Sequence, residues 1–500
     1  MAFRSNSKPD PVKITSPLTS FNEVEVASLS PSGQADFVYG ITLEAFQTAS
    51  FSGGSVTSSN QFAIVSSGTS ITGSGDVSLR RNLKYRPGQG SLARLTALFD
   101  TPAQGNVQLA GVGNSESGYF FGYSGTQFGI IHQETSDREI RVLTVSAGAG
   151  TETVTVTLNN VSVAVPVTGG ADINTTSYQI SKYNYANVGA GWVTDVIDGK
   201  VYFIGSRPGA RSGTYSATGT ATFAGTFAGL VSGSAGTSSF IPQESWNIDP
   251  LCGGCNSEFV LDPQKGNVYQ IGYQYLGFGN AFFGVESPET GRIIPVHIIK
   301  LANNRTTPVL KNPQMATRIV SANVGGTTNV SVKCASMAAF TQGNVRNLDP
   351  RFARSFSFTN YNNSTYRGLV IFRVNRIFRG ISCFGEMDIL RLSASNESTS
   401  KTLSVALFRN PTILNGTAIN FLQNDVNTSF VSYSDLSLSA DNFTATSAAS
   451  ISFQVGANNA TSLDILTNDL VFGQGDTVLL AIKTSGQVSG ELSINWYEQQ

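Results

Sequence analysis

The sequence predicts an all-β fold with at least two sandwich units, and three observations support this prediction. The chain contains 51 glycines and 31 phenylalanines, and only 13% of its residues are charged. This composition favours strands, tight turns and aromatic packing over amphipathic helices. From Val24 onward, short apolar stretches alternate with Gly, Ser and Asn clusters, as strands alternate with turns. The 500 residues exceed the ~250–300 at which one hydrophobic core usually stops growing.

The N-terminal segment and the charge balance exclude several classes of protein. Pro9, Pro11 and Pro17 block a helix, so residues 1–20 are predicted to form a flexible or extended arm. This arm has no apolar stretch, and we expect neither a secretory signal nor a membrane anchor. The whole chain lacks a run of ~18 apolar residues, so no membrane span is expected. With 32 basic and 33 acidic residues the net charge is -1, which argues against a nucleic-acid partner.

Three elements are expected in the middle of the N-terminal half. Residues 154–158 and 161–165 alternate apolar and polar side chains around Asn159-Asn160, which predicts a β-hairpin. Residues 172–185 begin with cap-type side chains and form the one plausible helix of the region. The Gly/Thr/Ala/Ser tract 209–238 has alternation but few large side chains, and we expect a thin exposed hairpin there.

The following region continues as a meander and ends at a predicted domain boundary. Residues 268–285 indicate two strands joined by a tight glycine turn, with Tyr and Phe pairing across them. The turn-type segment 287–291 precedes a strand over 292–300. Residues 344–354 are polar and contain Asp349-Pro350, so the domain boundary is placed there.

The C-terminal part restarts the all-β pattern in short units, which indicates a sandwich or jelly roll. A tight corner is expected at Gly473-Gln-Gly-Asp476, directly before a strand. The strands are expected at residues 368–374, 403–408, 451–455, 477–482 and 492–496.

Cysteines and histidines give little indication of chemistry. Four cysteines are too few for a disulfide framework in a chain of this size. Cys252 and Cys255 form a CGGC motif, but neither the helix of a redox pair nor a second pair of zinc ligands accompanies it. A glycine-rich loop is the favoured interpretation, with a short-loop disulfide as the alternative. His132 and His297 lie in apolar stretches and are expected to be strand residues, not general bases, and we expect no metal and no cofactor.

Paired carboxylates are the only serious route to catalysis, because the chain has no nucleophile elbow, phosphate-binding loop or H-E-x-x-H motif. Glycosidases need two carboxylates about 5–10 Å apart and no histidine. Strand spacing would place Glu386 and Asp388 on one face, a geometry compatible with acid/base work or with a cation site. Solvated acids are far commoner, so we predict no enzyme, with a glycan-degrading protein as the alternative. The pairs considered are Asp195 with Asp198, Glu286 with Glu289, and Glu386 with Asp388.

Basic and aromatic clusters are the remaining candidate sites. The basic groups could meet an acidic partner, but pairing with acids of the same protein is the favoured interpretation. Four tyrosines could stack on sugars if exposed, although rings of this kind are more often in the core. The basic groups are Arg80, Arg81, Lys84, Arg86 and Arg94, and separately Arg373, Arg376 and Arg379; the tyrosines are Tyr119, Tyr123, Tyr273 and Tyr275.

Several segments together resemble a family of virion structural proteins, described as tail-fibre-like or minor structural components of tailed phages and large double-stranded DNA viruses. The likeness spans most of residues 20–500, and no motif in it is catalytic. The segments that carry it are Arg80–Gly90, Leu95–Phe99, Gly118–Tyr123, Ser245–Pro250, Gly266–Tyr269, Tyr275–Gly279 and Asn303–Pro308.

The resemblance implies both an architecture and a role. It implies a concanavalin-like jelly roll over residues 21–140 and 245–345, a small β-rich insertion over 141–244, and a C-terminal β-sandwich over 346–500. The expected role is a non-enzymatic structural protein on the virion surface, which assembles as a homo-oligomer, most readily a trimer. Its expected partners are other virion proteins and a host surface glycan. A glycan-degrading tailspike and a bacterial surface adhesin are the alternatives.

Overall fold

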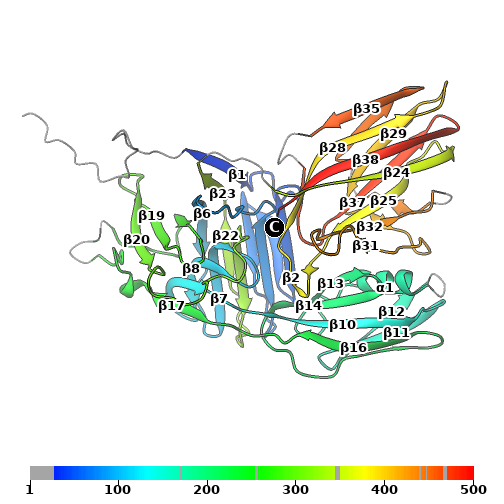
Figure 1. Cartoon of the computed structure of the whole chain (residues 1–500). Helices are drawn as coiled ribbons and strands as arrows, with labels where there is room; N and C mark the ends of the chain where they lie inside the picture. The colour runs from blue at the N-terminus through cyan, green and yellow to red at the C-terminus, as the bar shows by residue number, and fades with distance from the viewer. Residues whose placement is uncertain are drawn as a thin grey trace, which may run out of the picture.

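The computed structural model describes residues 28–168, 172–253, 257, 259–343, 349–438, 441–445, 448–465 and 470–499. Within these ranges the chain is almost entirely antiparallel β-structure, with one α-helix, α1 (Ile173–Lys182), and one 3-10 turn (Gln243–Ser245). The predicted all-β class is therefore confirmed (Figure 1). The arm expected over residues 1–20 lies outside the described residues.

The first unit is a jelly-roll sandwich of two sheets, whose strands come from residues 29–133 and 238–342. The nine-stranded sheet contains β1 (Leu29–Asp36), β3 (Ser55–Ser59), β4 (Phe62–Ser66), β6 (Ser91–Phe99), β18 (Asn267–Tyr273), β19 (Ala281–Glu286), β20 (Ile293–Ile299), β22 (Ser331–Cys334) and β23 (Ser336–Gln342). The seven-stranded sheet has the order β17 (Ser238–Pro242), β9 (Gln127–Gln133), β8 (Gly118–Ser124), β7 (Asn106–Gly113), β21 (Ala316–Asn323), β5 (Ser74–Leu79) and β2 (Phe46–Phe51).

Alternation along the strands explains how this sandwich closes. Val77 and Leu79 of β5 and Ile319 of β21 point inward and pack with Tyr269 and Phe283 of the opposite sheet. Their neighbours on the same strands point away from the core, because successive side chains of a strand face opposite sides. The two strands predicted within 268–285 and the strand after the turn over 287–291 are confirmed as β18, β19 and β20. The tight glycine turn expected between the first two is wrong, because residues 274–280 connect them as a longer loop.

The inserted unit, β10 to β16, leaves the first sandwich after β9 and returns at β17. One sheet contains β13 (Trp192–Ile197), β14 (Lys200–Pro208), β10 (Arg138–Ala147) and β16 (Ala224–Val231), and the other contains β12 (Val161–Val167), β11 (Glu152–Leu158) and β15 (Ser216–Gly219). The hairpin predicted at 154–165 is confirmed as β11 and β12, and Asn159 and Asn160 both have positive φ in its turn. The helix predicted from residue 172 is α1, and the Asp172 side chain caps it by accepting from Thr175 N.

The tract 209–238 is exposed over most of its length, as its composition suggested, but it is not a hairpin. β15 pairs with β11 in one sheet, whereas β16 pairs with β10 in the other, so the chain crosses between layers. Glu152 holds this crossing by accepting the backbone N–H groups of Ala221, Thr222 and Phe223 at 2.7–3.0 Å. The Phe223 ring enters the core of the insertion, which a surface hairpin would not allow.

The third unit is a β-sandwich over residues 351–499, and it contains all five strands expected there. One sheet contains β24 (Arg351–Tyr361), β38 (Val488–Gln499), β28 (Glu386–Asn396), β35 (Asn459–Asp464) and β36 (Val471–Phe472). The other has the order β31 (Leu422–Gln423), β32 (Val431–Asp435), β25 (Arg367–Val374), β37 (Thr477–Thr484), β29 (Leu403–Arg409) and β34 (Ile451–Val455). Two short ladders, β26 (Ile377–Phe378) with β27 (Ile381–Ser382) and β30 (Thr412–Ile413) with β33 (Phe443–Thr444), complete it.

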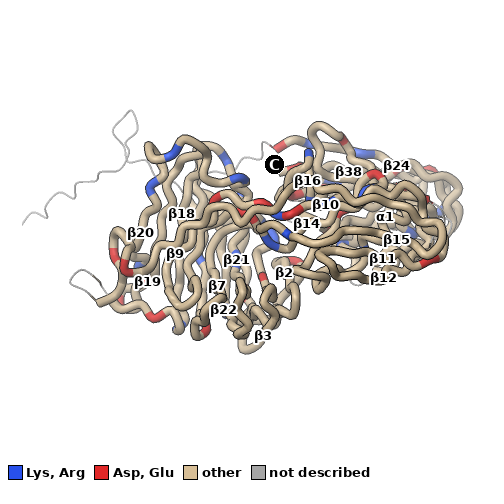
Figure 2. Tube along the Cα trace, turned by 90° about the horizontal axis from the view of Figure 1, so that it is seen from below, with Lys and Arg blue, Asp and Glu red and all other residues tan. Residues whose placement is uncertain are grey.

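The three units contact one another through cores and ion pairs. Figure 1 shows the insertion and the C-terminal sandwich beside the same side of the first sandwich, with α1 between those two units. Tyr178 of α1 and Val196 of β13 join an apolar cluster with Phe408 and Leu479 of the C-terminal sandwich. Figure 2 shows acidic and basic residues gathered near the junction of the units, between longer uncharged stretches.

Candidate binding cleft

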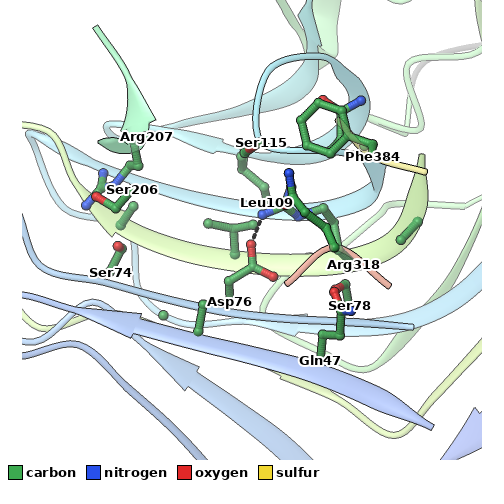
Figure 3. Close-up of a pocket in the computed structure, with 18 of the residues that line it drawn as sticks. Gln47, Ser74, Asp76, Ser78, Leu109, Ser115, Ser206, Arg207, Arg318 and Phe384 are labelled. Atoms are coloured by element: carbon green, nitrogen blue, oxygen red, sulfur yellow. Dashed lines mark ion pairs between the residues drawn. The ribbon is translucent and has the colours of Figure 1, made fainter. Parts of the chain in front are cut away.

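A cleft of about 980 Å³ lies where the three units meet. Its floor is the outer face of the seven-stranded sheet, and its walls come from the insertion and the C-terminal sandwich (Figure 3). Exposed side chains at its rim, such as Thr48, Ser238 and Asn410, open it to solvent. The volume is at the upper end of the range typical of ligand sites in proteins.

The floor is built by the outward residues of strands whose inward residues form the core. Ser78 lies opposite Arg318 in the ladder of β5 and β21, and Asp76 lies opposite Val320. Asp76 and Arg318 are therefore diagonal neighbours on this face, and their side chains form an ion pair. In Figure 3 this pair lies beside Leu109 of β7 at the centre of the floor.

The walls bring polar groups and aromatic rings over this floor. Ser206 and Arg207, at the end of β14, enter from one side, and Phe384 enters from the other (Figure 3). Arg207 is held by the backbone carbonyls of Thr72, Gly73 and Asn323, at 2.7, 2.9 and 3.1 Å. The aromatic lining consists of Phe51, Phe120, Phe240 and Phe384, and the uncharged polar lining includes Gln47, Thr48, Ser74, Ser78, Asn82, Asn114, Ser115, Ser124, Gln133, Ser206, Ser238, Ser239, Asn410 and Gln474.

Every carboxylate that lines the cleft is in an ion pair with an arginine. Asp76 pairs with Arg318, and Asp476 pairs with Arg80 and, at 3.2 Å, with Arg409. The third, exposed Glu44, is 3.0 Å from Arg409. A general acid for glycoside cleavage needs a protonated carboxyl at the substrate, and pairing with guanidinium groups favours the ionised form instead. Each carboxylate of the lining is therefore already engaged by a guanidinium group.

Glu386 and Asp388 do lie together on β28, but both are closed off from solvent, with 1% and 0% exposure. Asn82 N donates to Glu386 Oε1 at 2.6 Å, whereas Glu386 Oε2 has no hydrogen-bond partner among the residues that the structure describes. Burial raises the pKa of Glu386 to about 7, against the opposing charge of Lys84. Neither carboxylate lines the cleft, so neither can contact a substrate there.

Neither of the other carboxylate pairs, Asp195 with Asp198 and Glu286 with Glu289, lines the cleft. Asp195 is fully buried, 2.9 Å from Arg373 Nε, and accepts the backbone N–H of Arg376 at 2.6 Å. Asp198 is exposed, so the two aspartates do not face one another in a common pocket. The pairing that the sequence favoured for the basic groups is found for Arg80 and Arg373, each of which joins two units.

The four tyrosines expected to stack on sugars lie away from the cleft. Tyr119, Tyr123 and Tyr273 are at most 7% exposed within the core of the first sandwich. Tyr275 is half-buried and donates its hydroxyl to Leu310 O at 2.9 Å. The structure corrects the assignment, because rings inside the core cannot stack on a ligand. Phe120 lies between the core residues Tyr119 and Phe121 and lines the cleft.

The histidines and cysteines have structural surroundings. His132 is in β9, stacked on Tyr119 with ring centroids 4.7 Å apart, and burial lowers its pKa to about 4. His297 is in β20 and accepts from Asn247 N at 3.1 Å. Both are strand residues, as predicted. Cys252 is exposed, Cys334 and Cys383 are buried and unbonded, and Cys255 lies outside the described residues.

Membrane-spanning helices and metal clusters are both absent from the part of the chain that the structure describes. In it, no helix is long and apolar enough to span a membrane. In the same part, no three His, Cys, Asp or Glu side chains gather in a way that could hold a metal ion.

Sequence reasoning missed most of the cleft, although a signal existed for its floor. Ser74, Asp76 and Ser78 alternate with core residues, so β5 has a polar outward face. On β21 the outward residues that line the cleft are Ala316, Arg318, Val320 and Ala322, so Arg318 is the polar member of an otherwise apolar row. A polar outward face is ordinary for a strand beside solvent. Only the tertiary arrangement shows that the insertion and the C-terminal sandwich cover this one.

Comparisons with known proteins assign no family. No protein-family model matches the chain, and no curated protein matches it. Among solved structures, the botulinum neurotoxin serotype G binding domain is similar with a TM-score of 0.27 at 8% identity, and the match covers 81% of this chain. The chain spans 65% of the length of that binding domain.

Two lectins also match. The lectin UEA-II, in a complex with galactose, has a TM-score of 0.22 at 10% identity over 62% of this chain and 99% of its own. The Bauhinia forficata lectin, in a complex with GalNAc, has a TM-score of 0.21 at 11% identity over 63% and 99%. TM-scores this low carry no argument about function, and the fold described above rests on the sheets of this chain alone.

Proposed function

We propose that this protein is a non-enzymatic attachment component of a virus particle surface, which assembles as a homo-oligomer and binds a host glycan in the cleft. The observation that carries the glycan-binding part is the lining of the cleft. Phenylalanine rings offer apolar faces to the C–H faces of a sugar, and hydroxyl and amide side chains beside them offer donors and acceptors. The virion role comes from the resemblance of the sequence segments and remains a proposal.

The ion-paired carboxylates favour binding over cleavage. A glycan-degrading tailspike would need two free carboxylates in the cleft, one of them protonated. Burial raises the pKa of three carboxyl groups, Asp349, Glu386 and Glu498, and none of them lines the cleft. A bacterial adhesin would use the same cleft, so the two binding hypotheses differ in the particle that carries the protein and share this chemistry.

Glycan binding is tested by filling the cleft. Leu109 is half-buried at the centre of the floor, and Leu109→Trp places a large ring where the sugar would lie. We expect the wild-type protein to bind oligosaccharides on a glycan array and Leu109→Trp to lose at least tenfold in affinity. Leu422→Trp is the matched control, since Leu422 is 42% exposed on β31 and does not line the cleft.

Two results would contradict the proposal. Equal binding by Leu109→Trp and the wild type would remove the cleft as the site. New reducing ends after incubation with polysaccharide would show an enzyme, and their loss in Glu386→Gln or Asp388→Asn would assign it to those buried groups.

A further inference from the structure

The charged lining of the cleft is strongly biased towards arginine. Six arginines line it against three acidic residues, in a chain with 32 basic and 33 acidic residues in total. No lysine is among the lining residues. Arginine is the side chain that best matches planar or multidentate anions, because its guanidinium group presents several N–H donors in a fixed plane. The excess of positive charge is therefore local, and it faces a cavity.

Three of the six arginines are occupied by the protein itself. Arg80 and Arg409 both bind Asp476, and Arg80 also donates to the carbonyls of Leu43 and Phe46. Arg207 donates to three backbone carbonyls, as described above. These side chains hold the units together and have few N–H groups left for a ligand.

Each of the other three arginines has an N–H group without an acceptor among the described residues. Arg138 Nη2, Arg318 Nε and Arg376 Nε are buried, and none has a hydrogen-bond partner among the described residues. Arg138 and Arg318 each have one acidic partner, Glu116 at 3.3 Å and Asp76, which leaves these nitrogens unused. The Arg376 guanidinium has no hydrogen bond or ion pair in the described part of the chain, and it packs against Gly475.

Such donors are costly to bury and point to a missing anion. A buried N–H group without an acceptor destabilises a protein, and more so when the group is charged. Desolvation by burial lowers the pKa of Arg318 and of Arg376 to about 10; for Arg376 the charges of Asp195 and Asp476 oppose this shift only in part. An acidic group bound in the cleft would bring a compensating negative charge to these guanidinium groups. Phe384, 5.5 Å from the Arg138 guanidinium, supplies an apolar face beside them.

We propose, building on glycan binding in the cleft, that its ligand is an acidic oligosaccharide whose carboxylate or sulfate group is received by Arg318 and Arg376. Arg318 belongs to the floor and Arg376 to the wall formed by the C-terminal sandwich, so a ligand that reaches both bridges two units. The hydroxyl and amide side chains of the lining bind the rest of the sugar.

The test is a glycan array with matched triplets, in which each neutral oligosaccharide is printed beside its carboxylated and its sulfated form. Lactose, 3′-sialyllactose and 3′-sulfolactose form one such triplet, and titration calorimetry then gives the affinities. We expect an acidic member to bind at least tenfold more tightly than its neutral parent, with the difference shrinking as salt is added. Comparison of the carboxylated with the sulfated member of each triplet shows which of the two groups the protein recognises.

Arg376→Gln and Arg318→Gln should each lower the ratio of acidic to neutral affinity at least tenfold. Arg94→Gln is the control, because Arg94 is exposed on the other sheet and bonds to Gln270. Since the Arg376 guanidinium has no acceptor, Arg376→Gln should melt at or above the wild-type temperature, so lost binding is not lost folding.

The outcomes separate the two proposals. Equal binding of acidic and neutral sugars overturns the acidic specificity and leaves glycan binding intact. No binding to any member of the triplets overturns both. An acidic preference that survives Arg318→Gln and Arg376→Gln overturns the assignment to these residues.

Discussion

Asp476 is the side chain on which the junction of the units most depends, and its replacement by asparagine is the sharpest stability test. The carboxylate lies in the predicted tight corner Gly473–Asp476, with its side chain 9% exposed. It binds Arg80 of the first sandwich and Arg409 of its own unit, both 6% exposed. It also accepts from Gly473 N at 3.0 Å and from Asn410 Nδ2 at 2.9 Å.

Asp476→Asn removes the charge but keeps the shape. An amide nitrogen replaces one carboxylate oxygen and points N–H groups at existing donors, which leaves Arg80 without an anion. Removing one partner of a buried ion pair typically costs about 3–5 kcal/mol, because an uncompensated charge stays buried. Arg409 still has the carboxylate of exposed Glu44 at 3.0 Å. We therefore expect the free energy of unfolding to fall by an amount at the lower end of this range, about 3 kcal/mol.

Urea denaturation followed by tryptophan fluorescence measures this loss, because Trp496 is in the core of the C-terminal sandwich. Asp464→Asn is the control in the same unit: Asp464 pairs with Arg391, and their side chains are 68% and 50% exposed. The urea midpoint of Asp464→Asn should equal that of the wild type, since exposed ion pairs contribute little to the free energy of unfolding. Equal midpoints for the two variants would refute the reasoning that the buried pair joins the units.

Two further predictions concern pH and assembly. Because burial raises the pKa of Glu386 to about 7, the folded state holds a proton that the unfolded state has already released above its ordinary pKa of 4.5. The contribution of Glu386 to the free energy of unfolding is therefore most favourable below pH 4.5, and it falls by up to ~3 kcal/mol as the pH rises to 7. Glu386→Gln removes this titration, so the melting temperature of the variant should depend less on pH between 5 and 8. An unchanged slope would contradict the buried-acid interpretation. For the proposed homo-oligomer, light scattering at micromolar concentration should give a multiple of the 52.9 kDa chain mass, and a strict monomer would count against a particle-surface role.

Local patterns were sufficient for elements whose partners are close in sequence. The hairpin around Asn159-Asn160 follows from alternation and from two residues that tolerate positive φ. The helix follows from Asp172 as its cap. The hairpin predicted within residues 209–238 was wrong because the partners of its strands are distant in sequence. β15 and β16 pair with strands about 60 and 80 residues earlier, and composition does not show such partners.

The site was harder because a strand pattern has two faces. The stretch Tyr119-Phe120-Phe121 was recognised as aromatic, but period-2 alternation does not say which face is inward when both carry rings. Tyr119 and Phe121 enter the core, and Phe120 lines the cleft. Asp76 and Arg318 meet only because β5 pairs with β21, across more than two hundred residues of chain. No local pattern gives that contact.

The position of the cleft couples ligand binding to the arrangement of the units. Arg318 lies on the first sandwich and Arg376 on the C-terminal one, and Asp476 holds the same two units together a short distance along the wall. A ligand held between the two arginines stabilises the assembled form alone, and at one hundred times its Kd it contributes ≈ 2.7 kcal/mol. That is close to the loss expected for Asp476→Asn, so an acidic ligand should restore most of the stability of that variant. A ligand that bound only the floor would stabilise the first sandwich and leave the defect at the junction unchanged.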